Sequence, residues 1–188
     1  MTKTITRKTN RLNGYDYSNC GWYFITICTD NRKCLFGDII DRQINLNDSG
    51  KMIDDQWNNI PNRYNNVTLD QYTIMPNHMH GIIQIVGAGS PCPNNDINNN
   101  AINNGRGNHA PTLGQMIAYF KYQSTKQINL FNNLPGRKIW QRSFHDHIIR
   151  TDTSLQNIRE YIINNPATWD DDENNINNYS TRMGDVAK

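Results

Sequence analysis

Residues 67–86 read VTLDQYTIMPNHMHGIIQIV, two apolar runs separated by a break. The runs are Val67–Met75 and His80–Val86, and both are rich in the β-branched and aromatic residues that strands favour. Pro76-Asn77 interrupts them. Because the connection between the runs is short, we predict two strands that pair in antiparallel fashion.

His78-Met79-His80 lies where the second of these strands begins. Alternate residues of a strand share a face, so the two imidazoles are expected to project side by side while Met79 turns into the core. This arrangement suits two ligands of one metal ion. A His-x-His pair alone is more often structural, however, and His145 and His147 form a second pair that competes for the same role.

Further strands and helices are predicted on both sides of this stretch. Trp22–Thr29 is rich in aromatic and β-branched residues and is predicted to be a buried strand, and Cys34–Ile40 a shorter strand or a turn. Apolar residues at helical spacing, together with capping residues, predict three helices. The first helix follows Asn47-Asp48-Ser49 and ends at Pro61, and the others span Thr112–Leu130 and Asp152–Asn164, with an extended segment at Ile139–Ile149.

Two segments differ in composition from the rest of the chain. Residues 87–111 are rich in Asn, Gly and Pro and contain few large apolar residues, so we expect a flexible loop inserted in the domain. The polar residues 170–188 are expected to form a weakly ordered tail. Residues 1–169, with the loop inside them, have the length of one domain with its own core.

The overall composition sets few limits on function. The net charge of +2 neither requires nor excludes a nucleic-acid partner, so the local distribution of basic residues has to decide. The four cysteines form no Cys-x-x-Cys pair, which argues against a zinc cluster or a disulfide framework. Residues 1–11 lack the apolar region of a secretory signal, and no apolar run approaches the roughly 20 residues of a membrane span. We therefore expect a soluble cytoplasmic protein with no membrane partner.

Tyr161 and Asn165 form a second candidate site at the end of the last predicted helix. They are four residues apart and therefore lie on one helix face. A tyrosine hydroxyl can act as a nucleophile, and an amide oxygen can bind a hard metal ion. The alternative interpretation is that Tyr161 packs in the core and Asn165 is a polar helix end before Pro166.

Basic and aromatic residues of the C-terminal half suit contacts with single-stranded DNA, in which bases stack on rings and cations meet phosphates. The segment from Trp140 to His147 mixes both kinds of side chain. The alternative is an aromatic core segment whose His and Arg side chains are solvated. The candidate DNA contacts are Lys121, Lys126, Trp140, Arg142 and Arg150, and Lys138 could join Lys121, Lys126 and Arg142 in a track for phosphates.

Four blocks that follow one another along the chain resemble the HUH (His-hydrophobic-His) single-tyrosine transposases. Within that group they resemble the REP-associated tyrosine transposases, relatives of the smallest insertion-sequence transposases. The resemblance covers about Trp22 to Trp169, and the order of the blocks is more specific than any one of them. The blocks are Pro76–Ile83, Leu113–Lys121, Ile139–Phe144 with Asp146–Arg150, and Tyr161–Pro166, which matches a Tyr-x-x-x-Asn-Pro signature.

This resemblance implies a fold and a reaction. The fold would be an α/β (α+β) domain of the ferredoxin-like, RRM-like HUH nuclease type, with helices packed on a central antiparallel sheet. The reaction would be metal-dependent cleavage and rejoining of single-stranded DNA, at hairpins or repetitive palindromes, through a covalent 5′-phosphotyrosine and a free 3′-OH. The protein would be a transposase. The alternatives are a domesticated nickase, a DNA-hairpin-binding protein without catalysis, and a non-catalytic α/β domain with structural histidines.

The resemblance also assigns roles to residues. Tyr161 would be the nucleophile, and His78, His80 and Asn165 would hold Mg²⁺ or Mn²⁺, because two imidazoles and an amide oxygen make a mixed, neutral site. The protein would act near the nucleoid as a monomer or homodimer, with the tyrosine helix serving its own subunit or a partner's. The acidic run Asp170–Glu173 departs from the family, in which a basic and apolar segment usually follows the Asn-Pro, and it would repel DNA if it lay near the site.

Overall fold

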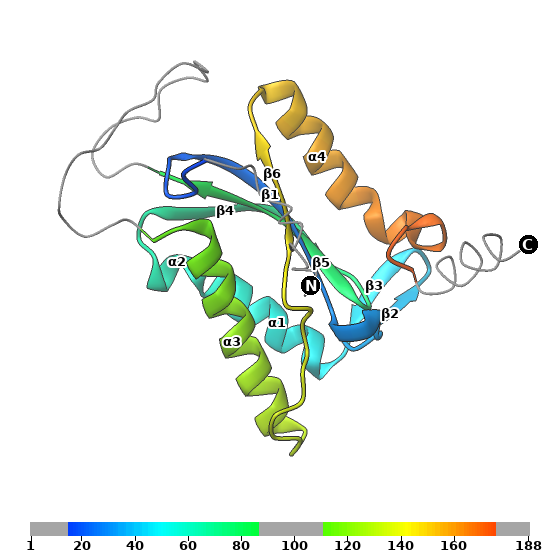
Figure 1. The fold of residues 1–188 in the computed structure, drawn as a ribbon. Coiled ribbons are helices and arrows are strands. Elements are labelled where there is room, and N and C mark those ends of the chain that lie inside the picture. The colour runs from blue at the N-terminus through cyan, green and yellow to red at the C-terminus, as the bar shows by residue number, and fades with distance from the viewer. Residues whose placement is uncertain (1–14, 87–110, 176–188) are drawn as a thin grey trace, which may run out of the picture.

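The computed structural model describes residues 15–86 and 111–175, which form a sheet with helices on both faces (Figure 1). Four strands make the main sheet in the order β4-β5-β1-β6, and every neighbouring pair is antiparallel. The strands are β1 (Gly21–Cys28), β2 (Gly37–Ile40), β3 (Gln43–Leu46), β4 (Val67–Ile74), β5 (His78–Ile85) and β6 (His145–Ile149). The helices are α1 (Asp48–Asn58), α2 (Ile60–Arg63), α3 (Leu113–Phe131) and α4 (Asp152–Asn164), with the short 3-10 helices η1 (Asp30–Arg32) and η2 (Asn165–Asp171).

The predicted antiparallel pair is confirmed as β4 and β5, which are joined by the break at Pro76-Asn77. β5 begins at His78, so both histidines of the motif belong to the strand. The register between the two strands shifts between Leu69 and Tyr72, which is a β-bulge. The hairpin β2–β3 was predicted only in its first half, as a strand or a turn.

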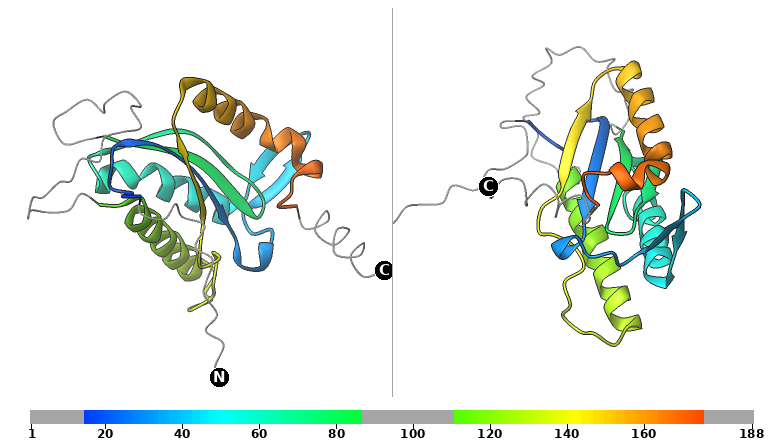
Figure 2. Two further views of the ribbon diagram at one scale, coloured as in Figure 1. Left: turned by 45° about the horizontal axis from the view of Figure 1, so that its top comes forward. Right: turned by 90° about the vertical axis from the view of Figure 1, so that its right-hand side faces the viewer.

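One face of the main sheet, called the apolar face below, packs against α1 and α3 (Figure 2). Its side chains alternate along β1 and β5 and are fully buried: Tyr23, Ile25, Ile27, Met79 and Ile83. Trp57 of α1 lies directly over Gly81 of β5, where an added Cβ would come within 2.5 Å of the Trp57 ring. The position therefore needs a glycine for close packing rather than for an unusual backbone angle.

The opposite face, called the polar face below, is covered by α4 (Figures 1 and 2). A small apolar cluster joins the helix to the sheet at one end, formed by Ile82, Ile149, Leu155 and Ile162. At the other end of β5 the same face carries His78 and His80. The residues of β1 on this face are therefore mixed in character, with Phe24 beside the apolar cluster and Thr26 beside His80.

The predicted helices are confirmed, and their caps explain where they begin. Thr112 caps α3 with a capping box that includes Gln115. Asn47 caps α1, and Thr151 caps α4, each by accepting a hydrogen bond from a backbone N–H of the first turn. Pro61 does not simply end the first helix: it lies at the start of α2, in the first turn where proline is tolerated.

The C-terminal boundary of the folded region differs from the expected one. η2 extends to Asp171, and Asp172, Asn174 and Asn175 are buried, so residues 170–175 belong to the packed domain rather than to a weakly ordered tail. The rest of the predicted tail, and all but Pro111 of the predicted loop 87–111, lie outside the described residues. Within residues 15–86 and 111–175, no helix has the length and apolar character needed to cross a membrane.

Candidate active site

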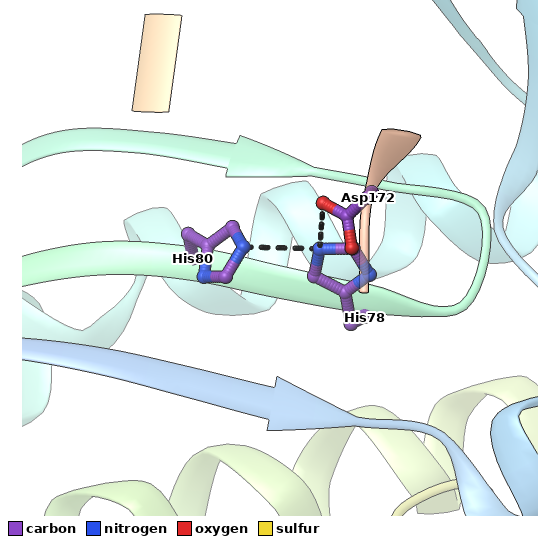
Figure 3. Close-up of side chains that lie close together, drawn as sticks. All are labelled: His78, His80 and Asp172. Atoms are coloured by element: carbon purple, nitrogen blue, oxygen red, sulfur yellow. Dashed lines mark hydrogen bonds and ion pairs between the residues drawn. The ribbon is translucent and has the colours of Figure 1, made fainter. Parts of the chain in front are cut away.

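His78 and His80 project side by side from β5, as the alternation of the strand predicts. Their Nε2 atoms lie 3.1 Å apart, and both side chains are almost completely buried (Figure 3). Met79 points to the apolar face and is fully buried there. The two imidazoles therefore form one polar group beneath α4.

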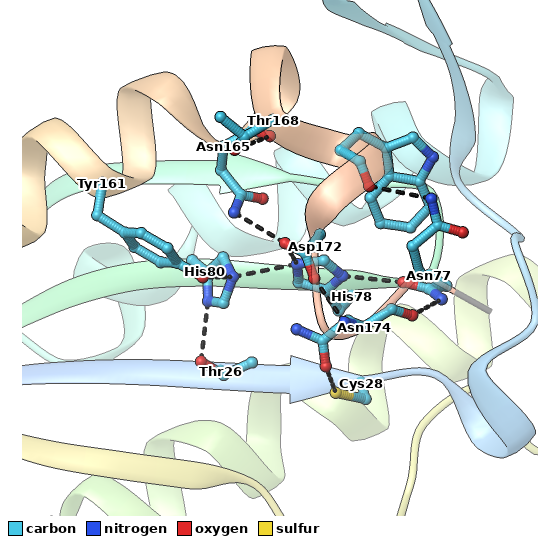
Figure 4. A network of polar contacts seen from close by, with 12 residues as sticks. Thr26, Cys28, Asn77, His78, His80, Tyr161, Asn165, Thr168, Asp172 and Asn174 are labelled. Carbon is cyan, nitrogen blue, oxygen red and sulfur yellow. Dashed lines mark hydrogen bonds and ion pairs between the residues drawn. The ribbon is translucent and has the colours of Figure 1, made fainter. Parts of the chain in front are cut away.

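Hydrogen bonds hold both rings by their other nitrogen atoms (Figure 4). His78 Nδ1 lies 2.8 Å from Asn77 Oδ1, and His80 Nδ1 lies 2.8 Å from Thr26 Oγ1. Since the Asn77 oxygen can only accept, His78 carries its proton on Nδ1, which leaves a lone pair on Nε2. Such contacts are typical of histidines that bind metal ions, because they fix the ring orientation and the tautomer.

Burial also keeps both histidines neutral. Desolvation lowers the pKa of His78 to about 3, with a further contribution from nearby Arg32. It lowers the pKa of His80 to about 3 as well, and His78 adds to that effect. At neutral pH both imidazoles can therefore offer a lone pair to a cation, and a proton does not compete for it.

Tyr161 of α4 and Asn165, the first residue of η2, reach this pair from the same chain (Figure 4). The Tyr161 hydroxyl lies 3.2 Å from His80 Nε2, and its ring meets Phe24 edge to face. The side chain is 44% exposed, so it is accessible from solvent. Desolvation, and then the charges of Asp172 and Glu173, raise the pKa of Tyr161 to about 12, which keeps its hydroxyl protonated at neutral pH.

Asn165 is only 1% exposed and lies at the point where α4 passes into η2. Its Nδ2 donates a hydrogen bond to Asp172 Oδ2 at 2.9 Å. Its Oδ1 is buried, and no residue that the structure describes donates a hydrogen bond to it. Asn165 also lies close enough to His78 to oppose the fall in the pKa of that imidazole. A buried oxygen without a donor costs about 1–3 kcal/mol, so this atom is suited to a ligand that the protein itself does not supply.

Asp172 is the site residue that the sequence analysis missed. One of its carboxylate oxygens lies 3.8 Å from His78 Nε2 (Figure 3). The other accepts a hydrogen bond from the Asn174 backbone N–H at 2.6 Å. Because His78 is neutral, the first contact is not an ion pair. The ligating atoms of His78, His80 and Asp172 all lie within 4.8 Å of one another.

The acidic run was expected to lie in the tail and to disfavour DNA, but its third residue is part of the site. η2 turns the chain back after Asn165-Pro166, and the Trp169 ring stacks on the His78 ring with 6.0 Å between the centroids. Asn174 is then held by Cys28, Arg32 and the Asp172 carboxylate. The large apolar Trp169 just before the acidic run is the one signal in the sequence that this segment packs against the domain.

The donor set fits a divalent cation. Two imidazole nitrogens, one carboxylate and one unpaired amide oxygen meet beneath α4, and all four residues are buried. A site that mixes oxygen and imidazole ligands suits Mn²⁺ and Mg²⁺. The competing pair, His145 and His147, is exposed on β6 and joins no metal-binding group within the described residues.

An ion pair fixes α4 over the sheet. Arg159 donates from Nε and Nη2 to the two carboxylate oxygens of Asp70, at 2.8 and 2.5 Å. Asp70 lies in the β-bulge of β4, and the Arg159 guanidinium also stacks over the Trp22 ring. Arg159 is two residues before Tyr161, so this contact sets the height and rotation of the helix that carries the tyrosine.

The residues predicted to contact DNA differ in their exposure to solvent. Lys126, Arg142 and Arg150 are exposed, whereas Trp140 is only 6% exposed and packs on Phe36 and Phe120. The Trp140 ring therefore cannot stack on a base, and its indole N–H donates to Ser124. Lys121 donates to the main-chain carbonyl groups of Gln141, Arg142 and Ser143, so its ammonium supports the loop before β6.

Comparisons with known proteins agree with this picture. No family model matches the chain. An uncharacterized protein of Haemophilus influenzae is 39% identical over 171 residues, which are 89% of this chain and 92% of that protein. A second H. influenzae protein, provisionally named a REP-associated tyrosine transposase, is 31% identical over 98 residues, which are 50% of this chain and 46% of that protein.

A solved structure is similar over most of the chain. It is a REP-associated tyrosine transposase bound to a REP hairpin, with a TM-score of 0.56, 18% identity, and coverage of 84% of this chain and 73% of that one. At this identity the likeness shows a shared fold, which confirms the predicted α/β fold with its central antiparallel sheet. The resemblance stated from the sequence blocks is also confirmed. The chain therefore belongs to one family with the H. influenzae protein that it matches over nearly its whole length, and it is similar to REP-associated tyrosine transposases in part of its sequence and in its fold.

Proposed function

We propose that this protein cuts and rejoins single-stranded DNA at hairpins or repetitive palindromes, with Tyr161 as the nucleophile. The main support is the meeting of two elements that are far apart in sequence. β5 supplies the buried histidine pair, and α4 brings the Tyr161 hydroxyl to 3.2 Å from His80 Nε2. The hairpin that is bound to the solved relative supports the substrate class. Such a protein would work in the cytoplasm, at the chromosome.

The proposed metal ligands are His78, His80, Asn165 and Asp172, of which the last is added to the set predicted from the sequence. When bound, a divalent ion would polarise the scissile phosphate and offset the negative charge that develops on it. A site that includes this carboxylate binds a hard divalent cation more tightly than a site of neutral ligands alone. We propose Mn²⁺ or Mg²⁺, which share this preference.

Tyr161 would form a bond from its phenolic oxygen to the scissile phosphorus as the bond from phosphorus to the 3′ oxygen breaks. The hydroxyl proton leaves, and since the side chain is 44% exposed, solvent can accept it. The departing 3′ oxygen takes up a proton to give a free 3′-OH. The phosphotyrosine remains a phosphodiester, so attack by a 3′-OH can reverse the step and rejoin the strand without another energy source.

The test is covalent attachment of the protein to labelled DNA. Purified protein is incubated with Mn²⁺ and with single-stranded oligonucleotides that cover the DNA flanking its gene, together with hairpin oligonucleotides of varied loop and flank sequence. The adduct is resolved on a denaturing gel. We expect an adduct with the wild-type protein and none with Tyr161→Phe, which should still bind the hairpin. Tyr119→Phe is the matched control, because Tyr119 lies on α3 against Tyr64, away from the histidines.

Two results would contradict the proposal. An adduct that survives in Tyr161→Phe would place the nucleophile elsewhere. Hairpin binding by the wild-type protein with no adduct in Mn²⁺ or Mg²⁺ would indicate a binding protein without catalysis.

A further inference from the structure

A hollow lies between α3 and residues 136–142, the segment that leads towards β6. Its volume is about 360 Å³, and we call it the basic groove. Its charged lining residues are Lys121, Arg137, Lys138 and Arg142, and no Asp or Glu is among the lining residues that the structure describes. The chain as a whole has a net charge of only +2, so positive charge is concentrated here.

The other main hollow has the opposite character. It lies between the β2–β3 hairpin and η2, and its lining includes Asp38, Asp41 and Asp170 with a single base, Arg42. A polyanion is therefore attracted to the basic groove and disfavoured in the hollow beside η2.

An exposed aromatic side chain completes the basic groove. Tyr122 lines the groove and is 63% exposed, so its ring is open to solvent there. Lys126 lies one helical turn further along α3 and is also exposed. A ring that is open to solvent and surrounded by cations is the combination on which single-stranded DNA stacks its bases and rests its phosphates.

The basic groove is attached to the candidate active site through a short series of contacts. The Gln141 backbone N–H donates to the carbonyl of Cys28, whose thiol donates to Asn174 Oδ1. The Asn174 backbone N–H donates to Asp172 (Figure 4). Three hydrogen bonds therefore join the wall of the groove to Asp172 of the candidate active site.

The start of β6 lies close to both the candidate active site and the basic groove. Thr26 of β1 pairs with His80 on one side and with His145 of β6 on the other, so all three side chains lie in one row on the polar face. Since neighbouring strands are about 4.8 Å apart, His145 lies about 10 Å from His80 across the sheet. His145 is exposed, and Arg142 precedes it by three residues.

We propose that the basic groove holds the single strand of DNA that flanks the hairpin and runs on from the candidate active site. This rests on the proposed function. Arg137, Lys138 and Arg142 contact its phosphates, Lys126 adds charge at the rim, and Tyr122 stacks on a base. Lys121 acts from below: its ammonium, held by the Gln141, Arg142 and Ser143 carbonyl groups, keeps the outer wall in place.

The test measures DNA binding without cleavage, by fluorescence polarisation in EDTA. Two probes share one hairpin stem, and one of them carries a single-stranded flank of about 12 nucleotides, a length within the site sizes typical of single-strand-binding proteins. Arg137→Gln with Lys138→Gln should weaken binding of the flanked probe about tenfold and change binding of the blunt probe less than twofold. The slope of log affinity against log salt for the flanked probe should fall by about 1.4, since each single-strand phosphate contact contributes about 0.7.

The matched control removes the same charge from another surface. Lys51→Gln with Arg63→Gln changes two basic residues of α1 and α2, away from the basic groove. If this double variant weakens the flanked probe as much as Arg137→Gln with Lys138→Gln, the effect is one of net charge and the inference fails. Tyr122→Ala should weaken the flanked probe about tenfold and leave the salt slope unchanged. Wild-type affinity for the flanked probe in this variant would exclude Tyr122 from the site.

The binding test of the groove and the adduct test of the proposed function can fail independently. If Tyr161 forms its adduct and the groove variants bind the flanked probe like the wild-type protein, only the inference about the groove fails. If the groove variants lose the flank preference and the wild-type protein forms no adduct, the groove stands as a DNA-binding surface and the catalytic proposal fails.

Discussion

The two faces of the main sheet use the same strands for different purposes. On the apolar face, β1 and β5 bury Ile25 and Met79 in the main core with residues of α1 and α3. On the polar face, the next residues of the same strands are Thr26 and His80, beneath α4. One face stabilises the domain through buried apolar area, and the other holds buried polar groups that cost free energy unless they are paired.

This difference indicates that the two faces contribute separately to the stability of the domain and to metal binding. The polar face contains two neutral imidazoles, a buried carboxylate and the unpaired Asn165 oxygen. None of these groups improves folding by itself, so the apolar face has to offset their cost. Changes on the apolar face should therefore mainly reduce stability and leave metal binding intact. Changes on the polar face should mainly reduce metal binding.

The largest expected effect on stability is at Trp57, on the apolar face. Trp57→Ala removes a fully buried ring that fills the space over Gly81, and we expect a loss of about 4 kcal/mol in the free energy of unfolding. For a domain of this size the melting temperature should fall by roughly 10 °C. Urea denaturation and thermal melting followed by circular dichroism measure both quantities.

The same Trp57→Ala preparation tests the separation of the faces. At a temperature where it remains folded, its affinity for Mn²⁺ should be within about threefold of the wild-type value, because Trp57 lies in the core on the apolar face and the histidines project to the other face. Trp57→Phe should lie between the two proteins in stability. A Trp57→Ala protein that is folded but has lost Mn²⁺ binding would show that the two faces are coupled.

The apolar face was largely predictable from the sequence, because periodicity acts over short distances. The alternation around Met79 and the helical spacing in Thr112–Leu130 and Asp152–Asn164 indicated correctly which side each residue faces. The hairpin partner β3 was missed because it has only four residues, so the alternation of Ile44 and Leu46 with polar neighbours is too short to be distinctive. Its turn also depends on positive φ angles at Asp41 and Arg42.

The polar face was predictable only in part. His78 and His80 could be paired from their spacing, but the approach of Tyr161 and Asn165 depends on how α4 docks, and that is set by Asp70 and Arg159. The sequence resemblance supplied that pairing where local pattern could not. Asp172 could not be predicted from the sequence for a different reason. A run of acidic residues resembles a solvated tail, and only the turn at η2 buries one of them.

The second expected effect is on metal binding, at Asp172. Asp172→Asn keeps the shape of the side chain and removes its charge, so we expect Mn²⁺ affinity to fall about 10- to 100-fold, measured by calorimetry or by electron paramagnetic resonance of Mn²⁺. The free energy of unfolding without metal should fall by only about 1–3 kcal/mol, because Asn165 and Asn174 each donate to one carboxylate oxygen and an amide can accept from only one of them.

Asp171→Asn is the matched control for this prediction. Asp171 is the neighbouring residue, carries the same charge and is exposed. Equal losses of Mn²⁺ affinity in the two variants would mean that the ion responds to the general charge of the segment. A loss confined to Asp172→Asn would assign the effect to the buried carboxylate.

The smallest expected effect is at the Asp70–Arg159 ion pair, which joins α4 to β4 on the polar face. The hydrogen bonds from Arg159 lower the pKa of Asp70 in the folded protein. A carboxyl group whose pKa is lower in the folded state contributes stability above its unfolded pKa of about 3.9 and loses that contribution as the pH falls through the folded value. Asp70→Asn should therefore reduce the free energy of unfolding by about 1 kcal/mol at pH 7, because the pair is only partly shielded from solvent.

The pH dependence decides whether charge, and not packing, holds α4 in place. The difference between wild-type protein and Asp70→Asn should be constant from pH 7 to about pH 5 and should shrink below about pH 4, as measured by urea denaturation. Asp55→Asn, at an exposed position of α1, should show no such difference. A deficit in Asp70→Asn that persists at pH 3 would mean that the substitution disturbs the packing of the β-bulge. If charge is responsible, adduct formation by Asp70→Asn at pH 7 should fall by more than its small loss of stability explains, since Arg159 is two residues from Tyr161 and α4 would no longer be held at the height that brings the hydroxyl to His80.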